Sequence, residues 1–330
     1  MGFNFCVGGI AMKKQHIVRM IGWVVLFIFG GGLFLINGIG LYAGNWFYEE
    51  VDVAYARDHR GEDSKHQEIL AEGKATKGWQ DVEIISKHGY NLQGTYIPSP
   101  QKSHKTLIFL HGFTKNRLYG LDYGRMYLQE GYNLLLVDSK AHGDSGGSSV
   151  SWGIQEKDDV DSWVDWVKNK FPDGVIGIHG ISMGAATALM YAGADEKQHK
   201  VDFYVADSAY SQLEPLLKEK IIEQIKLPED SFLPDVLLFY SNIVSYYKNR
   251  YTFHGSSPLT AIAAVTTPVL FIHGGADTLV PPKMSEDLYA SVKGPKELHI
   301  FPQAIHACAV YQDRRQYTQI VQTFIEKYGK

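Results

Sequence analysis

The residues best suited to chemistry in this sequence are a serine, an aspartate and a histidine in its second half. Ser182 stands in the pentapeptide GISMG, a G-x-S-x-G pattern, and Asp277 and His306 follow it in that order. A serine hydroxyl is a weak nucleophile unless a base takes its proton. A histidine oriented by a carboxylate supplies such a base. We therefore predict that Ser182 attacks, that His306 transfers the proton, and that Asp277 orients His306.

The pentapeptide occurs by chance in many chains, so the prediction depends on the elements around it. The apolar run Gly174–Ile178 predicts a strand before the serine, and Met183–Ala194 predicts a helix after it. The aspartate follows the predicted strand Val269–Ile272, and the histidine follows the predicted strand Glu297–Phe301. Because the carboxyl ends of parallel strands meet at one edge of a sheet, all three side chains are expected at that edge.

An acyl-transfer site also needs two N–H groups that bind the developing oxyanion. The amide of Met183, directly after the serine, is one candidate. The amide of Phe113, in the sequence HGF after the predicted strand Thr106–Leu110, is the other.

The carboxylate has a second candidate. Asp207 ends the predicted strand Val201–Ala206 and is the main rival of Asp277, which we favour because HGGAD follows the next strand. Asp138, Asp144 and the histidines at strand ends are interpreted as groups that brace loops.

The remaining pattern predicts a largely parallel α/β sheet. The expected strands alternate with helical segments, and runs such as TLIFL and NLLLV are apolar on both faces, as in strands that helices cover on each side. The other expected strands and helices are Val82–Ser86, Leu92–Ile97, Asn133–Val137, Ile154–Asn169, Pro282–Val292 and Tyr311–Lys327. Residues 210–256, roughly, are mostly helical in pattern and predict a cap inserted after the sixth strand.

These motifs resemble the α/β-hydrolase superfamily, and in particular bacterial membrane-anchored or secreted serine hydrolases of the serine aminopeptidase and prolyl-oligopeptidase-like branch. The matching pieces are HGF, DSKAHGDSGG, GISMGA, HGGADTLVP and AIHA. The resemblance implies an α/β-hydrolase fold of eight strands over residues 79–330. The family often has Arg-Gly where this chain has Lys140-Ala141, which weakens the assignment to a subfamily.

The N-terminus has a different composition. No charged residue lies between Met20 and Tyr48, and residues 20–44 are long enough for a transmembrane signal anchor, which needs about 20 apolar residues. Lys13, Lys14 and Arg19 precede this stretch, which predicts a cytoplasmic segment over residues 1–19 and a catalytic domain outside the cytoplasm. Residues 45–78 are expected to be a linker. A signal peptide cleaved near Gly44, which would release the enzyme, is the alternative, and translation from Met12 is another open point.

The charge and the cysteine content limit the classes of partner and cofactor that this protein is expected to bind. The net charge is −4 and no long basic run occurs, so nucleic acid is not expected as a partner. The two cysteines, Cys6 and Cys308, form no C-x-x-C pair, and no metal or organic cofactor is expected. The expected partners are a small-molecule, peptide or acyl substrate and membrane lipid around the N-terminal helix. The sequence predicts an esterase or a peptidase. Two alternatives are an acyltransferase with the same triad and a non-catalytic, membrane-tethered binding protein.

Overall fold

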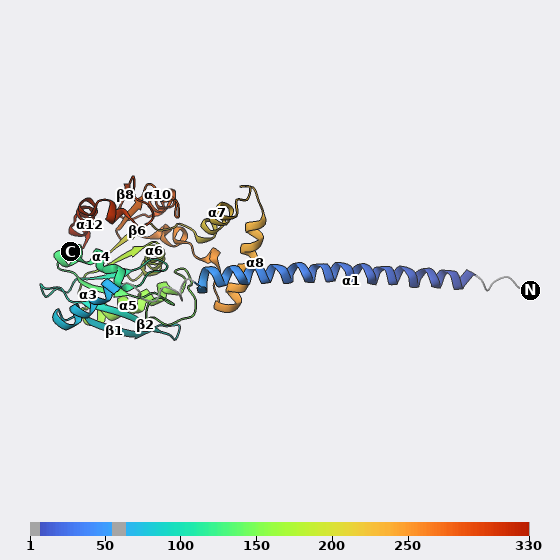
Figure 1. Cartoon of the computed structure of the whole chain (residues 1–330), viewed down its shortest axis with the longest axis horizontal. Helices are drawn as coiled ribbons and strands as arrows, with labels where there is room; N and C mark the ends of the chain where they lie inside the picture. Colours follow the sequence, from blue (N-terminus) through green and yellow to red (C-terminus); the bar gives the residue numbers. More distant parts are fainter. Residues whose placement is uncertain (1–6, 55–63, 330) are drawn as a thin grey trace, which may run out of the picture.

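A mixed eight-stranded sheet forms the centre of the computed structural model, which describes residues 7–54 and 64–329 (Figure 1). The strand order is β1-β2-β4-β3-β5-β6-β7-β8. The strands are β1 (Gln80–Ile85), β2 (Asn91–Ile97), β3 (Thr106–Leu110), β4 (Asn133–Val137), β5 (Ile176–Ile181), β6 (Phe203–Asp207), β7 (Val269–Gly274) and β8 (Lys296–Phe301). β1 and β2 form an antiparallel hairpin and β2 is antiparallel to β4, whereas all other neighbours are parallel. The predicted, mostly parallel sheet is confirmed.

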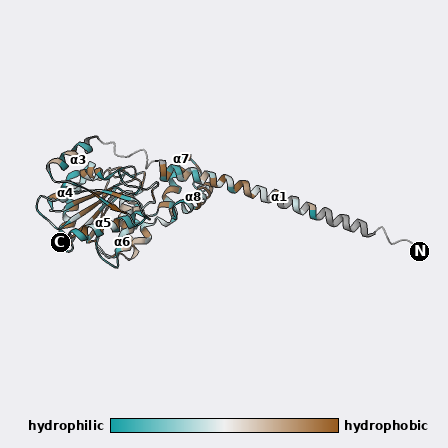
Figure 2. Ribbon diagram, turned by 90° about the horizontal axis from the view of Figure 1, so that it is seen from below, coloured by the Kyte–Doolittle hydropathy of each residue, from teal (hydrophilic) through white to brown (hydrophobic). Residues whose placement is uncertain are grey.

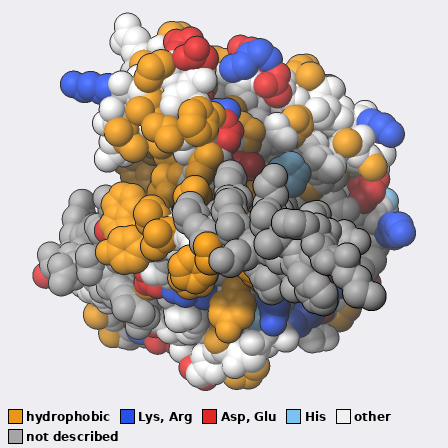
Figure 3. All heavy atoms as spheres, turned by 90° about the vertical axis from the view of Figure 1, so that its right-hand side faces the viewer, with side chains coloured by type: hydrophobic (Ala, Val, Ile, Leu, Met, Phe, Trp, Pro, Cys, Tyr) orange, Lys and Arg blue, Asp and Glu red, His pale blue; other side chains and the backbone are white. Residues whose placement is uncertain are grey.

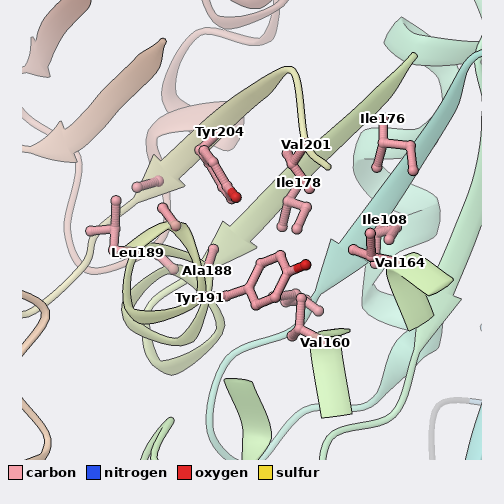
Figure 4. Close-up of a cluster of buried hydrophobic side chains, with 14 of the residues drawn as sticks. Ile108, Val160, Val164, Ile176, Ile178, Ala188, Leu189, Tyr191, Val201 and Tyr204 are labelled. Atoms are coloured by element: carbon pink, nitrogen blue, oxygen red, sulfur yellow. The ribbon is translucent and has the colours of Figure 1, made fainter. Parts of the chain in front are cut away.

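Helices cover both faces of the sheet. The helices are α1 (Val7–Tyr48), η1 (Glu49–Ala54), α3 (Ser64–Thr76), η2 (Arg117–Gly120), α4 (Leu121–Gln129), α5 (Glu156–Lys170), α6 (Met183–Asp195), α7 (Leu213–Ile225), α8 (Leu233–Asn249), η3 (Phe253–Gly255), α9 (Pro258–Ala261), η4 (Ile262–Ala264), α10 (Pro282–Ser291), α11 (Ala309–Gln312) and α12 (Arg314–Tyr328). One buried cluster joins the sheet to α5, α6 and α10, and Figure 4 shows part of it around Ile178 and Tyr191. A second cluster joins the other face to α4 and α12.

Several predicted boundaries differ from those of the structure by one to three residues, and two differences have a local reason. The strand predicted to end at Ile178 continues to Ile181, directly before the serine, because His179, Gly180 and Ile181 pair with β6. The single helix predicted over Tyr311–Lys327 is two helices. Asp313 separates them because its carboxylate accepts a hydrogen bond from the amide of Gln316 and so caps α12.

The N-terminal helix α1 projects from one end of the domain, and the cap helix α8 packs beside its inner end (Figures 1 and 2). This close contact requires the two glycines of α1 that face α8. A Cβ atom on Gly40 would lie 2.2 Å from the Tyr240 ring, and one on Gly44 would lie 2.6 Å from the Tyr240 backbone carbonyl carbon. Small residues four positions apart allow two helix backbones to approach each other closely. Helices α7 and α8 occupy the chain interval of the expected cap.

The expected transmembrane anchor over residues 20–44 lies within α1 but receives no support from the structure. Over the described residues, no helix combines the length and hydropathy needed to cross a bilayer. The side chains of residues 7–18 and of several positions between 21 and 29 lie outside the description, as do residues 1–6 with Cys6. Residues 55–63 of the expected linker also lie outside it, and α3 follows them.

Candidate active site

Ser182 lies in a sharp turn between β5 and α6. Its φ of +54° is in the left-handed region, which costs a non-glycine residue roughly 1–2 kcal/mol. The backbone around it is packed without room for side chains, because a Cβ atom on Gly180 would lie 2.3 Å from the Gly184 carbonyl oxygen. Gly184 is equally restricted, because a Cβ atom on it would lie 2.3 Å from the Leu110 carbonyl oxygen. The two glycines of the pentapeptide therefore let strand, turn and helix approach closely enough to project the serine at the sheet edge.

The structure brings the three predicted side chains into one hydrogen-bonded chain. Ser182 Oγ lies 2.8 Å from His306 Nε2, and His306 Nδ1 lies 2.7 Å from Asp277 Oδ2. Since a carboxylate can only accept, Nδ1 carries the proton and Nε2 is left to accept the serine proton. The His306 side chain is 19% exposed, so this base is reachable from outside. The arrangement can abstract a proton from the serine hydroxyl.

Asp277 is held as an ionised carboxylate. Its Oδ1 accepts hydrogen bonds from the amides of Leu279 and Val280, both at 2.9 Å, and its Oδ2 lies 3.2 Å from His273 Nε2. Burial raises the pKa of Asp277, but hydrogen bonds from His273 and His306, together with the attraction of the His306 charge, outweigh burial and lower the pKa below its usual range. This carboxylate can therefore stabilise a charged His306.

Asp207, the rival carboxylate, lies in a separate polar network. Its carboxylate accepts hydrogen bonds from Ser208 Oγ at 2.9 Å and from the Tyr317 hydroxyl at 2.9 Å. Ser208 Oγ in turn accepts the amide of Ala307 at 3.2 Å, next to His306. Burial raises the pKa of Asp207 and outweighs the hydrogen bonds from Ser208 and Tyr317. Asp207 thus contacts the histidine loop indirectly, whereas Asp277 bonds the imidazole itself.

The segment expected to supply the oxyanion site lies beside the serine. A Cβ atom on Gly112 would lie 3.4 Å from Ser182 Cβ, which places the peptide of Gly112 and Phe113 against the nucleophile. Met183 opens α6 and is buried, and the first N–H groups of a helix have no partner within the helix. The oxyanion roles of Phe113 and Met183 stay predictions.

Two buried histidines connect the Phe113 loop to the loop after β4. His111 donates from Nδ1 to the Gly112 carbonyl and accepts the Ser139 amide at Nε2. His142 donates to the Lys140 carbonyl and accepts the Thr114 amide. Burial lowers the pKa of His111 to about 3, so this ring stays neutral and keeps one donor and one acceptor. The loop-bracing interpretation fits these contacts.

The departure at Lys140-Ala141 also has a structural consequence. Ala141 has a φ of +60°, a conformation that glycine adopts without steric cost. Lys140 is buried, and its Nζ donates to Gln155 Oε1 at 2.7 Å. The chain therefore keeps the turn with an alanine in a glycine-like conformation.

His273 supports Asp277, a contact that the sequence did not predict, although the strand-end histidines were interpreted as groups that brace loops. His273 Nε2 lies within hydrogen-bonding distance of both Asp277 and the Val280 carbonyl, and Ser285 Oγ lies 2.6 Å from its Nδ1. The position of His273 at a strand end, four residues before the aspartate, was the available signal. Within residues 7–54 and 64–329, no group of His, Cys, Asp or Glu side chains is placed to hold a metal ion.

An apolar groove lies away from the triad, between α1 and α8. It encloses about 730 Å³, and its walls include Ile36, Ile39, Gly40, Phe239 and Tyr240. Figure 3 shows hydrophobic side chains gathered at this end of the molecule.

Comparisons with known proteins agree with this fold. A family model described as alpha/beta hydrolase fold matches residues 105–253, and one described as serine aminopeptidase S33 matches residues 253–311. The uncharacterised YqkD protein of Bacillus subtilis is 38% identical over 244 residues, which cover 74% of this chain and 78% of YqkD. The lysophosphatidylserine lipase ABHD12 of Danio rerio is 23% identical over 62% of this chain and 51% of its own length. The Pyrococcus furiosus esterase Pf2001 superimposes with a TM-score of 0.61 at 26% identity, covering 78% of this chain and 94% of the esterase. The chain belongs to the α/β-hydrolase superfamily.

Proposed function

We propose that this hydrolase is a serine hydrolase that cleaves carboxylic esters through an acyl-enzyme intermediate. The observation that carries the proposal is the hydrogen-bonded chain from Ser182 through His306 to Asp277. The likeness to the Pyrococcus furiosus esterase supports an ester in preference to a peptide as substrate. The amides of Phe113 and Met183 are the proposed oxyanion donors.

The proposed reaction has two halves. His306 Nε2 takes the proton of Ser182 as Oγ attacks the carbonyl carbon, and the protonated His306 then gives that proton to the leaving alcohol. In the second half, water attacks the acyl carbon while His306 takes a proton from it. The bond between the acyl carbon and Ser182 Oγ then breaks, the acyl group leaves as the acid, and His306 returns the proton to Ser182. Asp277 stays ionised throughout, because its low pKa keeps it a carboxylate beside the imidazolium.

Covalent labelling tests the nucleophile. A fluorophosphonate should modify the full chain at Ser182 alone, and Ser182→Ala should abolish the adduct seen by mass spectrometry. Thermal unfolding of the variant checks that the fold is kept. Labelling of Ser182→Ala at the wild-type rate would remove Ser182 from this role. Ester hydrolysis measured beside a peptide panel separates the esterase from the peptidase.

We also propose that the enzyme is attached to the cell membrane with its catalytic domain outside the cytoplasm. The uncharged stretch Met20–Tyr48, with basic residues before it and acidic residues after it, supports this orientation. Exposed apolar side chains on α1, including Phe27, Phe34 and Ile39, support contact with lipid.

Protease added to intact spheroplasts tests this location. The catalytic domain should be digested there as fast as in lysed cells. Protection in spheroplasts together with digestion after lysis would contradict the proposed orientation. A mature N-terminus near Gly44 would instead favour the released form.

A further inference from the structure

The end of α1 and the segment η1 that follows it pack into the wall of the candidate active site. Phe47 and Val51 belong to one apolar cluster with Met183, Phe113 and Trp152. The cluster therefore contains both residues whose amides are the proposed oxyanion donors. It also contains residues of the N-terminal segment, which is distant in the sequence from the rest of the cluster.

Asp52 forms the polar centre of this contact. Its side chain is fully buried, and Oδ1 accepts the indole N–H of Trp152 at 2.7 Å. Its other oxygen accepts the hydroxyl of Tyr251. The carbonyl of Asp52 accepts the amide of Val150 at 3.0 Å, so side chain and backbone hold the same loop. A buried carboxylate requires such partners, because an unpaired one is costly to desolvate.

Trp152 is held in a conformation that it would not adopt by itself. Its φ is +52°, and residues held in this region persist only when their surroundings impose it. Its carbonyl accepts hydrogen bonds from Tyr210 at 3.0 Å and from Ser256 at 2.6 Å. Glu156 accepts the amides of Ser151 and Gly153 on either side. The backbone of the loop is thus fixed by the domain, and the indole by Asp52.

The Trp152 ring lies directly against Phe113. The two ring centroids are 4.8 Å apart, and the Phe113 ring also contacts His142, with centroids 5.8 Å apart. Because the Phe113 ring contacts both of these rings, the orientation of the indole affects the peptide that precedes Phe113. That peptide lies beside Ser182, as the Gly112 contact indicates.

We propose that Asp52 is a positioning residue of the active site, which holds the Trp152 indole against Phe113 so that the Phe113 amide stays directed at the oxyanion. The proposal rests on the serine-hydrolase function proposed above. It gives the N-terminal segment a role in positioning the active site, in addition to the proposed attachment of the enzyme to the membrane. Asp52 does not touch the substrate and acts only through Trp152.

Steady-state hydrolysis of a short p-nitrophenyl ester by the full-length protein tests the proposal. An interaction made only in the transition state lowers kcat and kcat/KM equally. Loss of one oxyanion donor costs about 10²–10³-fold in kcat, and a displaced donor costs part of that. We expect Asp52→Ala to lower kcat about 10–100-fold and to leave KM within about twofold. An arylboronic acid, which forms a tetrahedral adduct on the serine, should lose affinity by a similar factor.

Matched variants separate positioning from a structural role. Asp52→Asn should keep the wild-type kcat, because the amide oxygen still accepts the indole N–H and the NH₂ group can donate to the Tyr251 hydroxyl oxygen. Tyr251→Phe removes the other hydrogen bond of Asp52 and should leave kcat unchanged. Trp152→Phe removes the indole N–H, so adding Asp52→Ala to it should cause no further loss of kcat.

The outcomes are distinguishable from those of the proposed function. If the wild type neither turns over esters nor binds a fluorophosphonate, the serine-hydrolase proposal fails. If the wild type is active and folded Asp52→Ala has the wild-type kcat and boronic-acid affinity, the positioning role is overturned. A loss of kcat in Asp52→Ala that Tyr251→Phe reproduces would also overturn it, because the effect would then not pass through Trp152.

Discussion

Asp277 and Asp52 are both buried aspartates, yet their surroundings shift their pKa values in opposite directions. Asp277 lies in the candidate active site, where two histidines and two backbone amides donate to it and its pKa is lowered. Asp52 lies where the N-terminal segment enters the domain. Burial there raises its pKa to about 7, and the hydrogen bonds from Tyr251 and Trp152 only partly oppose this effect.

The difference teaches that burial alone does not decide the charge of a carboxyl group. Desolvation is the largest influence on both residues. What separates them is the number of donors and the presence of a partner that can become a cation. The candidate active site offers four donors, one of them an ionisable imidazole, to Asp277, whereas Asp52 receives neutral donors from an indole and a phenol.

The strongest way to break the comparison is to remove the charge of Asp277. Asp277→Asn keeps the shape but favours the wrong tautomer of His306, and the same change in the triad of a serine protease costs about 10⁴-fold in kcat. We expect a loss of that order in ester hydrolysis for Asp277→Asn.

Asp207→Asn is the matched control, because Asp207 is also buried at the sheet edge but does not bond His306. Its loss of kcat should be much smaller, with both variants folded. The reverse ranking of the two variants would transfer the acid role to Asp207 and leave Ser182 and His306 in place.

A second test uses the pH dependence of stability at Asp52. A carboxyl whose pKa rises from 3.8 to about 7 on folding stabilises the protein fully below pH 3.8 and loses this contribution as the pH rises to about 7. The change is on the order of 4 kcal/mol. Asp52→Asn lacks this titration. Denaturant unfolding at pH 4.5 and pH 8 should therefore show that wild-type stability falls relative to Asp52→Asn as the pH rises. A difference between the two proteins that is independent of pH would contradict the raised pKa.

The smallest expected effect concerns the contact between α1 and α8. A Cβ atom on Gly44 would lie 2.6 Å from the Tyr240 carbonyl carbon, whereas one on Gly38 meets nothing within 4 Å. Overpacking of this kind costs roughly 1–3 kcal/mol, while alanine in an open helix position gains about 1 kcal/mol over glycine. Gly44→Ala should therefore lower the midpoint of thermal unfolding. Gly38→Ala should not lower it. Equal midpoints for the two variants would mean that the helices do not pack this closely.

Much of the site could be predicted because its signals are local in sequence. The strand, the G-x-S-x-G turn and the helix of Ser182 are contiguous, and their glycines are required by close backbone contacts. Asp277 and His306 were predicted from their positions after strands, since parallel strands bring their carboxyl ends to one edge. The mostly parallel sheet followed from the alternation of apolar strands and helices, and the cap interval followed from the long helical stretch that interrupts it.

The sequence by itself therefore determined the fold class, and it predicted the nucleophile and the edge of the sheet that carries it, because each depends on short-range periodicity and on strand ends. Only the tertiary structure distinguishes Asp277 from Asp207, since both follow or end strands and only Asp277 bonds His306. It alone brought Asp52 to Trp152, one hundred residues apart in the chain. The physical reason is that a hydrogen bond between distant residues depends on how whole elements pack, and no local pattern of residues records that packing.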